Sequence, residues 1–99
     1  MVLRWFNTGQ ARAFGEELAR YYDEQARAIA ASAAPKREGR YRRLLEQVLQ
    51  RARGFQREQA LNMLQKARLS NRLKWTLKDL GYDDELVDRL VREVLLAMT

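Results

Sequence analysis

Residues 41–55 have the sequence YRRLLEQVLQRARGF. Apolar side chains recur there every three or four positions, and arginines fill many of the positions between them. The apolar set is Tyr41, Leu44, Leu45, Val48, Ala52 and Phe55. A period of about 3.6 residues is that of an amphipathic helix. The stretch therefore predicts a helix with one buried and one basic face, which we place over residues 36–53.

The same periodicity continues on both sides of this stretch, so we predict helices throughout the chain. They cover residues 8–33, 36–53, 55–68, 70–80 and 83–98. Pro35 ends the first helix, because the residue before a proline disfavours the α region. Gly54 and Arg68–Ser70 are the predicted breaks, because the apolar stripe changes phase at each of them. One longer helix over residues 36–68 is the alternative.

The predicted helix ends carry further signals. Gly81 suits the left-handed residue that follows a helix, and Asp83 or Asp84 suits the N-cap of the next one. Ser70 or Asn71 would cap the helix over 70–80. Acid–base pairs four residues apart stabilise an exposed helix face. Examples are Glu16–Arg20, Asp23–Arg27, Glu85–Arg89 and Asp88–Arg92.

The composition also indicates an all-α fold. One proline and five glycines are too few for the many turns of an all-β chain. A chain of 99 residues forms one domain, because two independent cores would not fit. We predict a single all-α domain over residues 1–99, a compact bundle of four to five helices. Trp5 and Phe6 are expected to cover the core, and Trp75 to pack on a second helix face.

The formal net charge of +6 is distributed unevenly. Residues 36–78 contain thirteen Lys and Arg against three Glu, a net charge of +10. Residues 79–99 carry a net charge of −4, and residues 1–35 are neutral. Such asymmetry bears on the partners of a protein and not on its fold. The middle of the chain therefore attracts anions, and its end attracts cations.

Several kinds of chemistry are excluded by the absence of histidine and cysteine. Disulfides and thiolate metal sites cannot form, and the usual near-neutral general base is missing. Ser70 is better explained as a helix cap than as a nucleophile beside Lys66 or Lys74. Asp83–Glu85 lacks the spacing of a calcium loop, and the five glycines are isolated. We expect a non-enzymatic protein that binds no metal and no cofactor.

The basic middle segment makes nucleic acid the expected partner. Guanidinium groups bind phosphates in bidentate fashion, and each neutralised phosphate releases counterions. The candidate binding residues are Arg37, Arg40, Arg43, Arg51, Arg53, Arg57, Arg68, Arg72, Lys74 and Lys78. A merely solvated basic face is the alternative. The sequence does not distinguish DNA from RNA.

Residues 55–80 could also form a helix–turn–helix, with its turn near Ala67–Leu69 and a second helix exposing Arg72, Lys74 and Lys78. The usual glycine of the tight turn is missing. We therefore favour ordinary packing of two consecutive helices over this motif.

A protein–protein interaction module is the second functional hypothesis. The acidic last helix could dock on the basic middle of another copy, or the chain could act as an adaptor for an acidic partner. The wide apolar arc of residues 84–98 could be buried between two copies of a homodimer.

The start of the chain has no apolar segment of signal-peptide length, and no run of about 18 apolar residues occurs. We therefore expect a cytoplasmic protein without integral membrane association.

Overall fold

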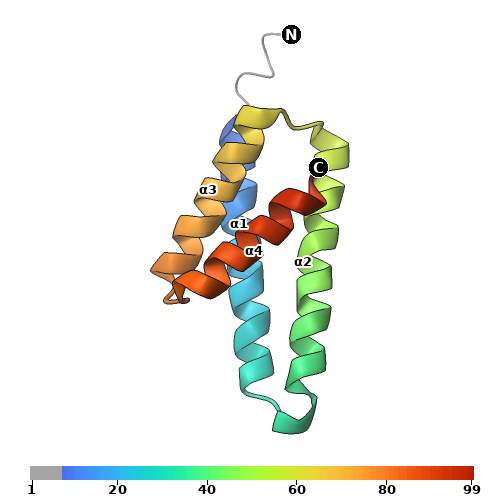
Figure 1. Cartoon of the computed structure of the whole chain (residues 1–99), viewed down its shortest axis with the longest axis vertical. Coiled ribbons are helices and arrows are strands. Elements are labelled where there is room, and N and C mark those ends of the chain that lie inside the picture. Colours follow the sequence, from blue (N-terminus) through green and yellow to red (C-terminus); the bar gives the residue numbers. More distant parts are fainter. Residues whose placement is uncertain (1–7) are drawn as a thin grey trace.

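A computed structural model describes residues 8–99, and that part of the chain is all-helical. It has four helices and a short 3₁₀ turn (Figure 1). The helices are α1 (Thr8–Ala30), α2 (Arg37–Gln59), α3 (Met63–Asp79) and α4 (Asp84–Ala97), and the turn is η2 (Ala34–Lys36). Trp5 and Phe6, predicted to cover the core, lie outside the described residues.

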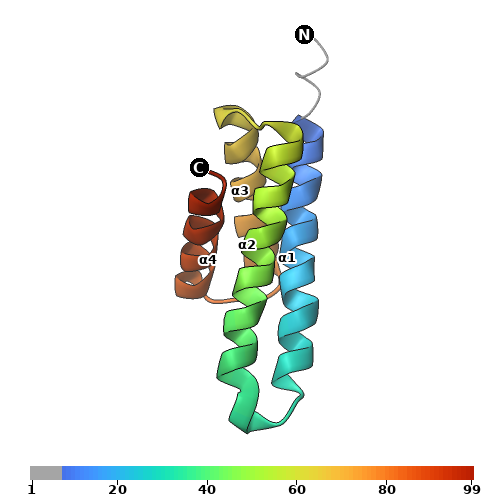
Figure 2. The same cartoon turned by 90° about the vertical axis from the view of Figure 1, so that its right-hand side faces the viewer.

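The four helices form an elongated bundle that measures 51 × 24 × 18 Å. α1 and α2 make an antiparallel hairpin joined through η2, and α3 runs beside the first half of α1 (Figure 1). α4 crosses obliquely over α2 and α3, on the side away from α1 (Figure 2). The end of the hairpin near η2 projects beyond α3 and α4.

The core lies between the four helices, on the apolar stripes that the periodicity predicts. Its most deeply buried large side chains are Leu18, Leu44, Val48, Leu69, Leu73, Leu77, Val87, Val94 and Met98. Phe14 and Phe55 stack at the open end of the hairpin, with ring centroids 4.0 Å apart. Of the apolar set predicted over residues 41–55, Tyr41 is exposed.

α1 approaches α3 closely because its buried face carries small residues one turn apart, Ala11, Gly15 and Ala19. A Cβ atom added at Gly15 would overlap the carbonyl oxygen of Leu69 and would lie 3.2 Å from the Cβ of Arg72. The backbones of the two helices thus meet at Gly15, where no larger residue fits without a shift.

The predicted break at Gly54 is wrong, because α2 continues through it to Gln59. A glycine inside a helix costs about 1 kcal/mol. The burial of Ala52 and the stacking of Phe55 beside Gly54 outweigh that cost. The helix ends instead at Ala60, which takes the left-handed conformation at φ 49°.

The predicted break at Arg68–Ser70 is also wrong, because α3 is one continuous helix. Its start is fixed by a capping box: the Asn62 side chain accepts from the Gln65 backbone N–H, and the Gln65 side chain accepts from the Asn62 N–H, both at 2.8 Å. Ser70 caps nothing, and its hydroxyl donates to the Ala67 carbonyl one turn back. The helix–turn–helix with a turn near Ala67–Leu69 is therefore absent from this region.

The boundary between α3 and α4 is confirmed. Gly81 has φ 99°, and the N–H groups of Gly81 and Tyr82 return to the carbonyls of Lys78 and Leu77, which closes α3 with a Schellman motif. The Asp83 side chain accepts a hydrogen bond from the Leu86 N–H at 2.8 Å and caps α4. The first helix is shorter than predicted. α1 ends at Ala30, three residues before the predicted end at residue 33.

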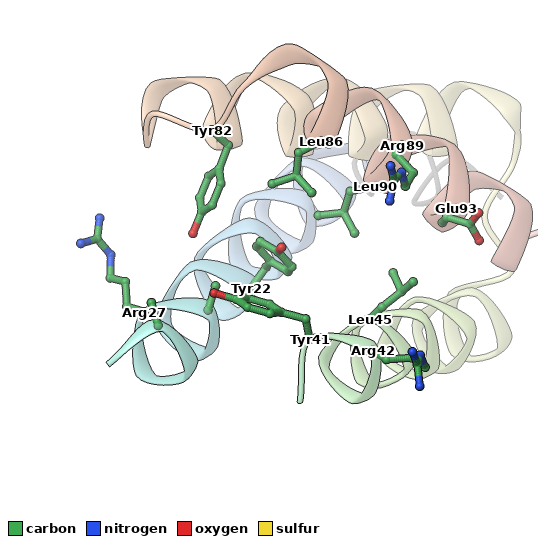
Figure 3. A pocket seen from close by; sticks show the side chains of 12 residues that line it. Tyr22, Arg27, Tyr41, Arg42, Leu45, Tyr82, Leu86, Arg89, Leu90 and Glu93 are labelled. Carbon is green, nitrogen blue, oxygen red and sulfur yellow. The ribbon is translucent and has the colours of Figure 1, made fainter. Parts of the chain in front are cut away.

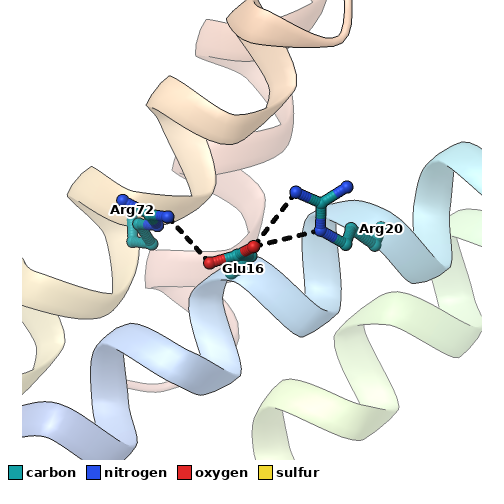
Figure 4. Close-up of polar contacts among 3 residues, drawn as sticks. All are labelled: Glu16, Arg20 and Arg72. Atoms are coloured by element: carbon teal, nitrogen blue, oxygen red, sulfur yellow. Dashed lines mark hydrogen bonds and ion pairs between the residues drawn. The ribbon is translucent and has the colours of Figure 1, made fainter.

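Glu16 of α1 forms ion pairs with two arginines (Figure 4). One is Arg20, the predicted pair on the same helix at 3.0 Å, and the other is Arg72 of α3 at 2.8 Å. The hydrogen bonds from Arg72 and Arg20 lower the pKa of the Glu16 carboxyl. The pair Asp23–Arg27 also forms, at 3.0 Å. Within residues 8–99, Glu85–Arg89 and Asp88–Arg92 do not come within pairing distance.

Candidate nucleic-acid interface

Most arginines of α2 are exposed and available to another molecule. Arg40, Arg42, Arg43 and Arg57 are exposed, and Arg53 is half-buried. Among residues 8–99, no carboxylate oxygen lies within 4.0 Å of any arginine of α2. These guanidinium groups therefore keep their charge and most of their donors for another molecule.

Three of these arginines share the edge of α2 that faces α1. Arg40, Arg43, Gln47 and Arg51 follow one another at spacings of three, four and four residues, and we call them the α2 edge. Such spacings keep side chains on one side of a helix. The edge is a continuous row of donors, which is what a charged polymer backbone requires.

A cleft of about 320 Å³ opens between α1 and the α2 edge. Arg40, Arg43, Gln47 and Gln25 supply its polar lining, over an apolar floor that includes Ile29. The Tyr21 hydroxyl donates to Gln47 Oε1 at 3.0 Å, which leaves the amide nitrogen of Gln47 free to donate outward.

Arg51 extends the edge by one more turn of α2. Its guanidinium carbon lies 3.8 Å from the centroid of the Tyr21 ring. Stacking on an aromatic face restrains a guanidinium without using its N–H donors. Arg51 is therefore held in place while its donors remain available.

Three of the predicted binding residues have internal partners. Arg37 donates two hydrogen bonds to the Ser32 carbonyl, at 2.9 and 3.2 Å, and so fixes the turn after α1. Arg72 binds Glu16, and Lys78 lies 3.3 Å from Asp84. These side chains hold helices together, which reduces what they offer to a ligand.

The predicted binding residues do not form one surface. α2 and α3 lie on opposite sides of the bundle, with α1 and α4 between them (Figures 1 and 2). Arg68 and Lys74 of α3 line a separate shallow pocket of about 410 Å³, next to Val91 of α4. The structure therefore divides the predicted set into the exposed arginines of α2 and a smaller group on α3.

Trp75, expected to be packed, is 51% exposed. Lys74 and Lys78 place their amino groups 5.5 and 5.3 Å from its ring centroid. The expectation was wrong because the buried faces of α3 are already filled by leucines such as Leu73 and Leu77.

Sequence reasoning missed the polar partners of the α2 edge, Gln25, Gln47 and Tyr21, and a groove lined by tyrosines. Gln47 lies four residues from both Arg43 and Arg51, and this spacing could have placed Gln47 on the α2 edge. Nothing in the sequence alone brings the tyrosines of α1, α2 and the α3–α4 loop together.

Residues 8–99 contain no cluster of three or more carboxylates able to hold a metal ion. In the same range, none of the helices is both long and apolar enough to cross a lipid bilayer.

Comparison of the chain with protein-family models, curated proteins and solved structures finds no match. The part of the chain that the structure describes is a small all-helical fold, with several exposed arginines on one long helix.

Proposed function

We propose that this protein binds nucleic acid without catalysis, through phosphate contacts from the exposed arginines of α2. The observation that carries the proposal is the row formed by Arg40, Arg43 and Arg51, three guanidinium groups without a carboxylate partner in residues 8–99. A rise of about 1.5 Å per residue spreads this row over about 16 Å of helix. That length suits contacts with several successive phosphates.

The chemistry of the edge favours backbone recognition over base reading. Its guanidinium groups are exposed and have no carboxylate partner among residues 8–99, so phosphates can pair with them. Phosphate contacts fix the position of a protein on a polynucleotide but carry no sequence information. Binding should accordingly tolerate many sequences and weaken steeply with salt.

Fluorescence anisotropy with labelled duplex and single-stranded oligonucleotides, repeated at rising salt, tests the proposal. The double variant R40Q/R43Q should bind more weakly, and its slope of log K against log salt should fall by about 2, close to one per lost phosphate contact. The matched control R12Q/R92Q removes the same charge from exposed arginines of α1 and α4. Equal losses in both variants, or no binding to either oligonucleotide at low salt, would refute the proposal.

Self-association is a second candidate function, and exposed apolar side chains favour it. Leu96 of α4 is 63% exposed and Met63 of α3 is 85% exposed, with Leu64 and Leu95 beside them in sequence. A contiguous exposed apolar surface often marks an interface, and these side chains are candidates to contribute to one. Light scattering over a range of concentrations tests this: a dimer that Leu96→Glu converts to monomer supports it, and a monomer at every concentration contradicts it.

A further inference from the structure

A second recess, drawn in Figure 3, is lined by Tyr41, Arg42 and Leu45 of α2, none of which belongs to the α2 edge. It has a volume of about 560 Å³, which is within the range of pockets that hold small organic ligands. Tyr22, Tyr41 and Tyr82 line it together with leucines of α2 and α4. We call it the tyrosine groove.

The wall of the tyrosine groove is held by its own contacts. The Tyr82 hydroxyl donates to Asp23 Oδ1 at 2.7 Å, and the Tyr82 ring meets the Tyr22 ring edge-on, with centroids 5.5 Å apart. Burial raises the pKa of Asp23, but the hydrogen bonds from Tyr82 and Arg27 outweigh it and keep that pKa below its ordinary value. Burial is the main cause that raises the pKa of Tyr82, and the hydrogen bond to Asp23 raises it further. A wall fixed in this way needs little ordering when a ligand enters.

The apolar lining is recessed. Leu45 and Leu86 are partly buried, Leu90 is buried, and Tyr41 is the one large apolar side chain of the lining that is exposed, at 37%. The strongly exposed apolar side chains of the described chain, such as Met63 and Leu96, lie elsewhere. A recessed lining suits a small body that enters the groove better than a broad protein face.

One end of the tyrosine groove is charged. Arg42 of α2 and Arg89 of α4 lie there, on either side of the opening, with Glu93 next to them (Figure 3). Within residues 8–99, neither arginine forms an ion pair with a carboxylate. Arg27, at the opposite end, is already bound to Asp23. The free positive charge is therefore concentrated at the end that Arg42 and Arg89 flank.

We propose that the tyrosine groove binds one monomeric amphipathic organic anion, with its apolar body between the tyrosines and leucines and its carboxylate between Arg42 and Arg89. The arginines select the carboxylate of the ligand, and the apolar lining selects its apolar body. Glu93 repels the carboxylate and limits the affinity. The proposal does not depend on the binding of nucleic acid.

Isothermal titration calorimetry with decanoate below its micelle concentration tests the proposal, with 1-decanol as the neutral analogue. Decanoate should bind more tightly than decanol, and affinity should rise about fourfold per methylene from hexanoate to decanoate. R42Q/R89Q should weaken decanoate binding by about tenfold or more without weakening decanol. Glu93→Gln should strengthen decanoate binding, a change of the opposite sign.

Two further variants locate the site. Ala30 is exposed and lines the groove, so Ala30→Trp should fill it and abolish binding. Ala31→Trp places the same ring one residue further, outside the lining, and should bind as the parent protein does. R40Q/R43Q should also leave decanoate binding unchanged, which separates this site from the α2 edge.

Absence of decanoate binding would overturn the proposal, as would binding that Ala30→Trp and Ala31→Trp reduce equally. Sedimentation with phosphatidylglycerol vesicles distinguishes a membrane surface from a free ligand. Vesicle binding that R42Q/R89Q abolishes, without binding of monomeric decanoate, would assign the arginines to lipid headgroups and refute the groove.

Discussion

The close contact between α1 and α3 at Gly15 can be tested by adding one methyl group. In Gly15→Ala the new Cβ would overlap the carbonyl oxygen of Leu69 and crowd the Cβ of Arg72 at 3.2 Å. The first obstacle is backbone, so no side-chain rotation relieves it and the two helices must separate. The buried neighbours Ala11 and Ala19 would then lose contacts as well.

The magnitude follows from two opposing terms. Alanine is better than glycine inside a helix by about 1 kcal/mol. Overpacking a close-packed interior costs about 1–3 kcal/mol, and a backbone obstacle places Gly15 at the upper end of that range. The free energy of unfolding should therefore fall by about 2 kcal/mol in Gly15→Ala.

Gly54→Ala provides the matched control. The same methyl group added at Gly54 of α2 would meet no described atom within 4 Å, so this variant should gain about 1 kcal/mol from helix propensity alone. Urea unfolding followed by circular dichroism at a helix wavelength measures both. A Gly15→Ala protein as stable as the parent, or one that gains as much as Gly54→Ala, would refute the close approach of α1 and α3.

Three further predictions concern a helix end, a cap and an ion pair. Ala60→Gly should raise the free energy of unfolding by about 1 kcal/mol in the same urea assay, because alanine is strained at φ 49° and glycine is not; a loss of stability would contradict the left-handed helix end. Asn62→Ala should cost about 1 kcal/mol, whereas the neighbouring exposed residue Met63, changed to Ala, should have little effect. The pKa of Glu16 is lowered in the folded protein from its ordinary value of 4.5, so its contribution to stability is present above pH 4.5 and is lost as the pH falls through the lowered pKa. Thermal unfolding of the parent and of Glu16→Gln should therefore converge as the pH falls below 4.5, and a constant difference would contradict this.

The helical fold could be predicted from the sequence, but two of its breaks could not. Periodicity identified the buried stripes, because burial of one face dominates the stability of a helix. The phase change of the apolar stripe was assigned to Gly54 and to Arg68–Ser70, whereas the chain breaks between them, after Gln59. At Gly54 the local preference against helix, about 1 kcal/mol, is smaller than the packing on either side. The real break lies at Ala60, a residue with no preference for the left-handed conformation. The capping box of Asn62 and Gln65 was the one local signal that could have located it.

The sequence predicts the charge of the candidate interface and the common edge of its arginines, but not which cations are free. Helical spacing shows that Arg40, Arg43 and Arg51 share one edge of α2. Some cations already have an internal partner, and the sequence does not show which ones. Such partners come from distant segments, as in the pair of Arg72 and Glu16, which are 56 residues apart. The division of the basic residues between α2 and α3 likewise depends on how α1 and α4 separate these helices.

The projecting end of the α1–α2 hairpin gives the protein regions of unequal local stability. Near η2 the hairpin extends past the ends of α3 and α4 (Figure 1), whereas residues such as Leu18 and Leu73 are enclosed by the bundle. Partial opening of the hairpin end therefore requires less free energy than global unfolding, and its amide hydrogens should exchange with solvent first. Arg40 and Arg43 stand on this more easily opened end, so a polymer bound there would slow amide exchange in the hairpin while leaving exchange in the bundle nearly unchanged.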